Sequence, residues 1–376
     1  MQILVLIVIL GILVGIELLY YRRHALDRVD LDVHFSQNIA NFGEVIELVE
    51  IAQNNKKLPL PFLLLKFETP LVLEFQDMTN TSVSDLLYRE DILTMKPFSR
   101  HTRKIKARCS KRGYYPIARV NISTSDLLLL ERMTKECDAD DSITILPERL
   151  DPSEIKPLLS ITFSDILQRR TLLTDPFSFA GIREYQPWDP MRSINWTATA
   201  KTGDFMVNQN ASTSTRQVSI FVNLEVYNTK KSTNLLEKSI SMAFSYMCEL
   251  VRMGIPTTIY TNGKDVQFCS PVISDMVADE SGLLRQGVDL ARIDLSQEVL
   301  PFPLLLEEHA LKMNRDDFIV VISPKYDGSL RPALLHLKHT HPSLLWVMPA
   351  YKVTPSVQLE SELASGYYRW EVIGHD

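Results

Sequence analysis

Residues 218–226 read VSIFVNLEV, and residues 232–253 read STNLLEKSISMAFSYMCELVRM. The first run is almost wholly apolar, which is typical of a strand buried on both faces of a sheet. The second run places leucine, isoleucine and methionine at helical spacing, and Gly254 and Pro256 mark its end. A buried strand followed by an amphipathic helix is the building unit of a parallel sheet, so this stretch predicts an α/β fold.

The same alternation continues toward the C-terminus. A second apolar strand, FIVVI at 318–322, is again followed by a helical pattern. We therefore expect a doubly wound, mostly parallel sheet over residues 211–376. The other predicted elements are a strand at 257–260 that turns at Asn262-Gly263 and pairs back over 266–269, helices near 279–293, 302–314 and 329–339, and a strand at 344–348.

Residues 22–150 show a different period. Apolar and polar residues alternate in short runs, and turn signals rich in Asn, Gly and Pro separate the runs. In one such run Ile105, Ala107 and Cys109 fall on one face of a strand, with basic side chains between them. Several short strands of this kind predict a small antiparallel β-sandwich-like domain.

The chain begins with an apolar segment. Glu17 is the first charged side chain, and two tyrosines precede Arg22. About 20 apolar residues span a hydrocarbon core of roughly 30 Å. A signal peptide would carry a basic stretch ahead of the apolar run and small residues at a cleavage site. Here only Met1 and Gln2 precede the run, and YYRRH at 20–24 follows it. We therefore expect residues 1–21 to be a single-pass anchor in the cell membrane. The cluster of Arg22, Arg23 and Arg28 predicts that the remaining chain faces the cytoplasm.

The overall composition excludes several classes of protein. The chain of 376 residues has a net charge of −6, which does not suggest a nucleic-acid binder. Hydrophobic residues at 45% and charged residues at 23% are ordinary globular values and exclude disorder as the main state. The four cysteines form no C-x-x-C pair, which disfavours a zinc ribbon and a thioredoxin-like site.

One segment departs from this charge balance. Between Lys96 and Arg119 there are nine basic residues and no acid. Lys104, Lys106 and Arg108 share the polar face of the strand in this segment. They could contact anionic lipid headgroups or an acidic partner, or form a solvated face that keeps an edge strand from pairing. Neither the net charge nor a binding motif supports a contact with nucleic acid.

Between the two halves, residues 175–207 read DPFSFAGIREYQPWDPMRSINWTATAKTGDFMV. This stretch closely resembles the signature of the bacterial domain of unknown function 58 family. Upstream, KRGYY at 111–115, SDL at 125–127 and ILP at 145–147 resemble weaker motifs of the same family. Two departures are present, since the family's Pro-Gly-Asp-Asp turn is PWDP at 187–190, and its Asp-Pro-Phe-Gly-Leu is reduced to DLL at 126–128.

The signature mixes side chains that favour burial, such as Ile182, Ile194 and Trp196, with paired charges. An arginine fork can clamp a carboxylate, so Arg183 could satisfy Asp189 and fix a loop. We expect residues 151–210 to link the two domains by packing, with Arg183 and Trp196 as buried anchors. A docking surface and a catalytic site are the two alternatives. The candidate residues are Gly181, Arg183, Tyr185, Asp189, Arg192, Asn195 and Trp196.

The resemblance implies that the C-terminal half is similar to the von Willebrand factor A fold. Active members hold a divalent cation with Asp-x-Ser-x-Ser after the first strand, and oxygen ligands suit magnesium or calcium. The matching positions here are Asn223, Glu225 and Tyr227, and tyrosine is a poor third ligand. We therefore expect a degenerate site with neither metal nor cofactor. The cluster of His336, His339 and His341 is a weaker metal candidate.

These observations predict a membrane-anchored interaction or scaffold protein rather than an enzyme. The family resemblance implies work with a MoxR-type AAA+ ATPase in envelope assembly or protein maturation. The alternative is an envelope-associated hydrolase or transferase with an unrecognised active site. The sequence contains no Walker A, G-x-S-x-G or H-E-x-x-H motif, which favours the first hypothesis.

Overall fold

The computed structural model describes residues 2–69, 72–75, 81–83, 87–117, 120–137, 139–172, 179–187, 189–210, 217–225, 230–310, 312–326, 328–355 and 357–372. The chain divides into two units, the first formed by residues 1–148 and 287–294 and the second by residues 149–286 and 295–376. Each unit has its own apolar core, so the two are described separately.

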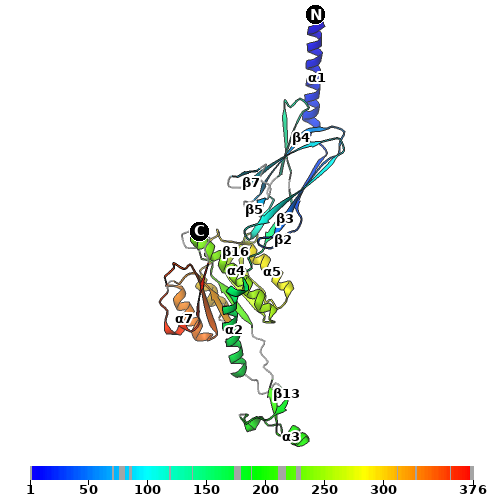
Figure 1. The fold of residues 1–376 in the computed structure, drawn as a ribbon. Helices are drawn as coiled ribbons and strands as arrows, with labels where there is room; N and C mark the ends of the chain where they lie inside the picture. Colours follow the sequence, from blue (N-terminus) through cyan, green and yellow to red (C-terminus); the bar gives the residue numbers. More distant parts are fainter. Residues whose placement is uncertain are drawn as a thin grey trace. The chain divides into compact units, whose positions relative to one another are not determined.

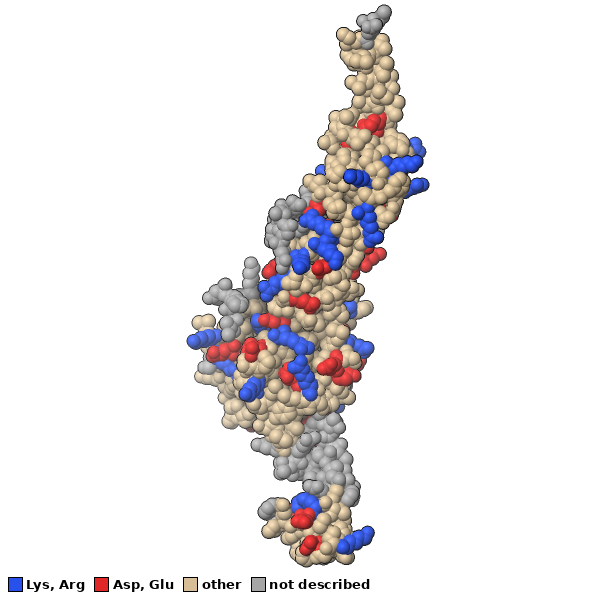
Figure 2. All heavy atoms as spheres, turned by 45° about the vertical axis from the view of Figure 1, so that its right-hand side comes forward, with Lys and Arg blue, Asp and Glu red and all other residues tan. Residues whose placement is uncertain are grey.

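The first unit begins with the apolar helix α1 (Gln2–His24), which is long and apolar enough to cross a membrane. Figure 2 shows its outer part as a surface without Lys, Arg, Asp or Glu. The rest of this unit is built from short antiparallel strands. A four-stranded sheet has the order β1 (Val29–Phe35), β3 (Val45–Asn54), β8 (Arg100–Cys109) and β5 (Leu73–Phe75).

A second, five-stranded sheet completes the sandwich-like domain. Its order is β11 (Arg132–Cys137), β10 (Val120–Ser125), β4 (Leu60–Thr69), β7 (Leu87–Met95) and β6 (Thr81–Val83). A small sheet joins β2 (Ile39–Ala40), β12 (Ser142–Ile145) and β9 (Gly113–Pro116). The alternating apolar residues of the two larger sheets, including Leu48, Phe67 and Ile105, form the common core. The predicted β-sandwich-like domain is therefore present.

The predicted buried face of β8 is correct, because Ile105, Ala107 and Cys109 are all buried. Strand β8 pairs with β3 over residues 100–108, and β5 pairs with its other side only over residues 107–109. The alternative that basic side chains protect an edge is therefore wrong for Arg108, but it stays a prediction for Lys104 and Lys106, because no described strand pairs with that side of β8 at their positions. Lys104 Nζ lies 3.0 Å from Glu47 Oε2.

The second unit contains a mostly parallel sheet (Figure 1). Its strand order is β17 (Pro271–Ile273), β16 (Thr257–Asp265), β15 (Val218–Val222), β19 (Phe318–Ile322), β20 (Leu344–Ala350) and β21 (Tyr367–Glu371). All neighbours run parallel except β17, which is antiparallel to β16. The five residues of β15 and of β19 are all buried, as the apolar runs predict.

Helices cover this sheet. Helices α6 (Phe302–Ala310) and α7 (Leu330–Thr340) pack on the side chains of Phe221, Ile319 and Trp346. Helix α4 (Lys230–Arg252) contacts β15, β16 and β20, and α2 (Pro152–Leu172) packs on α4, where Thr162 and Tyr246 share a hydrogen bond. The second unit also contains α8 (Ser361–Ala364) and the signature segment with β13 (Phe179–Glu184), η1 (Met191–Ser193), α3 (Trp196–Thr202) and β14 (Met206–Asn210). Helix α5 (Glu280–Ala291) begins in the second unit and ends in the first, to which β18 (Ile293–Asp294) belongs.

Two features of the second unit differ from the sequence-based expectation. The predicted turn at Asn262-Gly263 lies inside β16, and the returning strand is residues 271–273 rather than 266–269. Asn262 is fully buried, where its Oδ1 accepts from the Leu224 amide and its Nδ2 donates to the Leu300 carbonyl. These bonds satisfy the amide group within the sheet, so the local turn preference of Asn-Gly is overridden.

Candidate interaction surface

The signature segment folds as a hairpin with a short helix. Strand β13 (Phe179–Glu184) pairs antiparallel with β14 (Met206–Asn210), and Gly181 stands opposite Gln209 next to a register shift. Between the strands lie the 3-10 turn η1 (Met191–Ser193) and helix α3 (Trp196–Thr202). Asn195 caps α3, because its Oδ1 accepts from the Ala198 amide at 3.0 Å.

A bidentate ion pair fixes the turn of this hairpin. The two Nη atoms of Arg183 each lie 2.6 Å from an oxygen of Asp189, whose side chain also accepts from the Gln186 amide at 2.9 Å. These hydrogen bonds hold the pKa of Asp189 below its usual range, the Arg183 contact being the largest cause. The ion pair therefore stabilises the turn at neutral pH, and this stabilisation is lost as pH falls through the lowered pKa.

The prediction that Trp196 is a buried anchor is wrong. Its side chain is 63% exposed, and the residues buried in this segment are instead Ile194 and Val207. Helix α3 contains no buried residue, because its seven residues present small or polar side chains next to the single tryptophan. Arg192 in η1 is likewise exposed.

Trp196 instead belongs to an aromatic cluster at the surface. The ring of Phe205 lies edge-on to Trp196 at 6.4 Å and to Tyr185 at 6.1 Å between centroids. Phe205 and Met191 are also exposed. No sequence pattern pointed to Phe205 or Met191, since their exposure depends on how the hairpin closes. We refer to Ile182, Tyr185, Met191, Trp196 and Phe205 as the signature surface.

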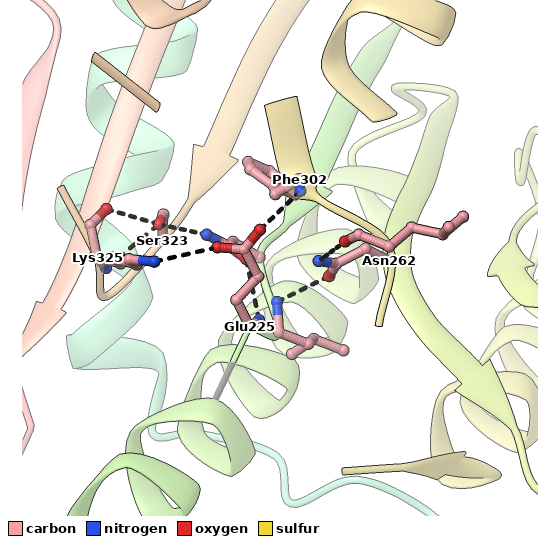
Figure 3. A network of polar contacts seen from close by, with 8 residues as sticks. Glu225, Asn262, Phe302, Ser323 and Lys325 are labelled. Atoms are coloured by element: carbon pink, nitrogen blue, oxygen red, sulfur yellow. Dashed lines mark hydrogen bonds and ion pairs between the residues drawn. The ribbon is translucent and has the colours of Figure 1, made fainter. Parts of the chain in front are cut away.

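A second polar site lies at the carboxyl end of the parallel sheet (Figure 3). Asn223 follows β15, and its Nδ2 donates to Ser323 Oγ at 3.1 Å, while its Oδ1 accepts from the Glu225 amide at 3.0 Å. Ser323 follows the neighbouring strand β19, and its Oγ donates to the Lys325 carbonyl at 2.8 Å. The network thus joins the ends of two adjacent parallel strands.

Glu225 is fixed at the centre of this network. One carboxylate oxygen accepts from the Phe302 amide at 2.8 Å, at the N-terminus of α6, and the other lies 3.5 Å from Lys325 Nζ. The ammonium of Lys325 therefore lies against the carboxylate that the sequence nominated as a cation ligand. Lys325 was not anticipated, because it lies 100 residues after Glu225 in the chain and follows a different strand, β19.

Of the three positions predicted to form a degenerate metal site, Tyr227 lies outside the described residues. The side chain of Asn223 binds Ser323, and that of Glu225 pairs with Lys325. Among the described residues there is no group of three or more His, Cys, Asp and Glu side chains placed to hold a metal ion. His339 instead lies 3.3 Å from Glu362, and His341 is buried next to Thr340.

Comparisons with known proteins assign no family. No family model matches the chain, and no curated protein matches it. Similar solved structures include the CARDB domain of the PF1109 protein from Pyrococcus furiosus, with 11% identity, 32% of this chain and 96% of that chain covered, and a TM-score of 0.22. A non-cellulosomal cohesin from Archaeoglobus fulgidus shares 14% identity over 31% of this chain and 91% of that chain, with a TM-score of 0.21. Likeness at this level identifies neither fold nor function.

Proposed function

We propose that this chain is a membrane-anchored interaction protein that binds a protein partner through the signature surface. The observation that carries the proposal is the cluster of the exposed Trp196 and Phe205 with the half-buried Tyr185, on a hairpin fixed by the Arg183–Asp189 ion pair. Tryptophan, tyrosine, methionine and arginine are the side chains enriched at the centres of protein interfaces. A fixed aromatic cluster also loses little conformational entropy on binding.

We further propose that the partner is a MoxR-type AAA+ ATPase acting in envelope assembly or protein maturation. The signature at 175–207 supports this identity through its resemblance to the domain of unknown function 58 family. The strand order β17-β16-β15-β19-β20-β21, with one antiparallel edge, supports a von Willebrand factor A-like fold for the second unit. The apolar helix α1, the one candidate membrane span among the described residues, supports anchoring of the chain in the cell membrane.

A pull-down with the full chain tests the proposed partner. The tagged chain is solubilised from its native membranes with mild detergent, captured, and its co-purifying proteins are identified by mass spectrometry. We expect a MoxR-type AAA+ ATPase to be recovered, and to bind again when both proteins are purified and mixed. If the captured chain carries no MoxR-type AAA+ ATPase, or if the purified pair does not bind, the proposed partner is contradicted.

Thiol labelling in intact cells tests the proposed cytoplasmic orientation. Cys269 is exposed, whereas Cys109 is buried, and burial raises the pKa of the Cys109 thiol to about 11. A membrane-impermeant maleimide should therefore leave Cys269 of the Cys137→Ser variant unmodified in intact cells and modify it after permeabilisation. The Cys137→Ser/Cys269→Ser variant is the control. Labelling of Cys269 in intact cells would show that the chain faces outward.

A further inference from the structure

The hairpin between β10 and β11 ends in four consecutive exposed leucines. Residues 127–130 are all leucine, and each side chain is between 51% and 64% exposed. Exposed apolar side chains that occur singly are common, but four in a row at a hairpin tip are not. We refer to these four residues as the leucine loop.

The turn holds the leucines outward at a conformational cost. The Asp126 carboxylate accepts from the backbone amides of Leu128, Leu130 and Glu131 at 3.0, 2.8 and 2.7 Å. Leu129 has a φ of 60°, in the left-handed region that glycine or asparagine adopts more easily. The turn therefore carries an apolar side chain at a position where leucine strains the backbone.

The leucine loop lies beside α1, at the level of Glu17 in that helix. The Leu127 amide donates to Glu17 Oε1 at 2.9 Å, and Arg22 Nε lies 3.7 Å from Glu131 Oε1 at the base of the loop. Glu17 precedes Arg22 by five residues, which is about 7.5 Å along a helix axis. The loop thus reaches past the arginines toward the uncharged end of α1, as the hairpin next to α1 in Figure 1 illustrates.

A second exposed apolar side chain lies near the same end of the domain. Phe98, in the turn between β7 and β8, is 67% exposed with a φ of 51°, and its amide donates to the Lys56 carbonyl. Lys56 Nζ in turn donates to the carbonyls of His24 and Asp27 at the end of α1. Lys57, Lys96 and Arg100 are exposed around this turn and Arg22 and Arg23 at the end of α1, which suits anionic headgroups.

These observations favour a lipid contact at the end of the domain next to α1 over the one expected at Lys104, Lys106 and Arg108. Strand β8 begins at Arg100, next to the Phe98 turn, and runs away from α1. At about 3.3 Å per residue, Lys106 and Arg108 lie roughly 20 and 26 Å further from the end of α1 than Arg100 does. Lys104 already pairs with Glu47. The proposed lipid contact of Lys104, Lys106 and Arg108 is thus less favoured than one at the α1 end.

We propose that the leucine loop and Phe98 insert into the lipid bilayer next to α1, so that the first unit is seated on the membrane rather than tethered to it. This inference rests on the proposed membrane anchor. Insertion buries four leucine side chains that otherwise remain in water, and it places Arg22, Lys57 and Lys96 at headgroup level. The hydrogen bond from Leu127 supplies a partner for Glu17 at membrane depth.

Site-specific fluorescence in nanodiscs tests the insertion. The full chain with Cys137→Ser and Cys269→Ser receives one added cysteine, Leu128→Cys, labelled with an environment-sensitive fluorophore. The nanodiscs contain anionic lipid and, in two parallel samples, lipids with a nitroxide near the top of the acyl chain, at the depth of the leucine loop, or near its end, at the depth of Leu10. We expect a blue-shifted emission and loss of most of the fluorescence on adding nitroxide lipid, because the label sits among acyl chains.

Two further positions separate the possible failures. Leu10→Cys lies in α1 and reports the anchor, whereas Val353→Cys is 91% exposed in the second unit and reports water. Quenching at 10 but not at 128 would overturn the leucine-loop inference and leave the anchor intact. Absence of quenching at both positions would overturn the anchor as well. A blue shift at 128 without lipid quenching would show that the label packs against the protein itself, and it would likewise contradict insertion.

Discussion

Replacing Trp346 with alanine should lower the free energy of unfolding of the second unit by about 3–5 kcal/mol, whereas Trp196→Ala should change it by less than about 0.5 kcal/mol. Trp346 is 1% exposed. Its ring stacks on that of Tyr326 at 4.8 Å between centroids, and the ring of Tyr367 lies 4.9 Å away, measured in the same way. Alanine would leave a cavity among these rings. Trp196 is 63% exposed and its ring lies edge-on to the exposed Phe205, so its removal leaves no buried cavity.

Chemical denaturation of the full chain in detergent, followed by circular dichroism, measures both effects. Trp346→Phe is the matched control, because it keeps a ring at this position and should cost much less than alanine. Equal destabilisation by Trp346→Ala and Trp196→Ala would restore the buried-anchor role that the sequence predicted for Trp196. It would also remove the structural basis of the signature surface.

Trp196→Ala should weaken binding of the proposed ATPase partner by about 30-fold or more, because an exposed tryptophan at the centre of an interface typically contributes 2 kcal/mol or more. The measurement is the dissociation constant of the purified pair, with the full chain in detergent. Phe268→Ala removes a side chain that is 72% exposed elsewhere in the second unit, and it should leave binding unchanged.

This prediction separates a recognition surface from a structural one. Unchanged binding of Trp196→Ala beside parent-like melting would show that the signature surface does not bind the ATPase. Equal weakening by Phe268→Ala would assign binding to the wider surface of the second unit. Loss of binding accompanied by a lowered melting temperature would return Trp196 to the structural role.

The sequence predicted the parts of the fold that depend on local pattern. The apolar runs of β15 and β19, the alternation in β8 and the apolar helix α1 are each recorded in consecutive residues. Helix α2 was not predicted, because Pro157 and its many polar residues give it almost no amphipathic pattern. Its contact with α4 through Thr162 and Tyr246 is a tertiary property that local pattern does not contain.

The candidate sites divide in the same way. The pairing of Arg183 with Asp189 was anticipated, because the two residues lie six positions apart in one turn. The exposure of Trp196 was not, because amphipathic burial depends on which elements face the residue. The junction of Glu225 with Lys325 was equally hidden, since their strands are neighbours only in the folded sheet.

The Glu225–Lys325 pair has a consequence for how the carboxyl end of the sheet responds to its surroundings. Its positive charge is encoded in the chain and cannot be withdrawn by a chelator or diluted away. In a site neutralised by a bound cation, the fraction of molecules with the charge neutralised depends on the concentration of that cation. Here the neutralising ammonium group belongs to the chain itself and reaches Glu225 when the protein folds, so this ion pair forms without any ion from the surroundings.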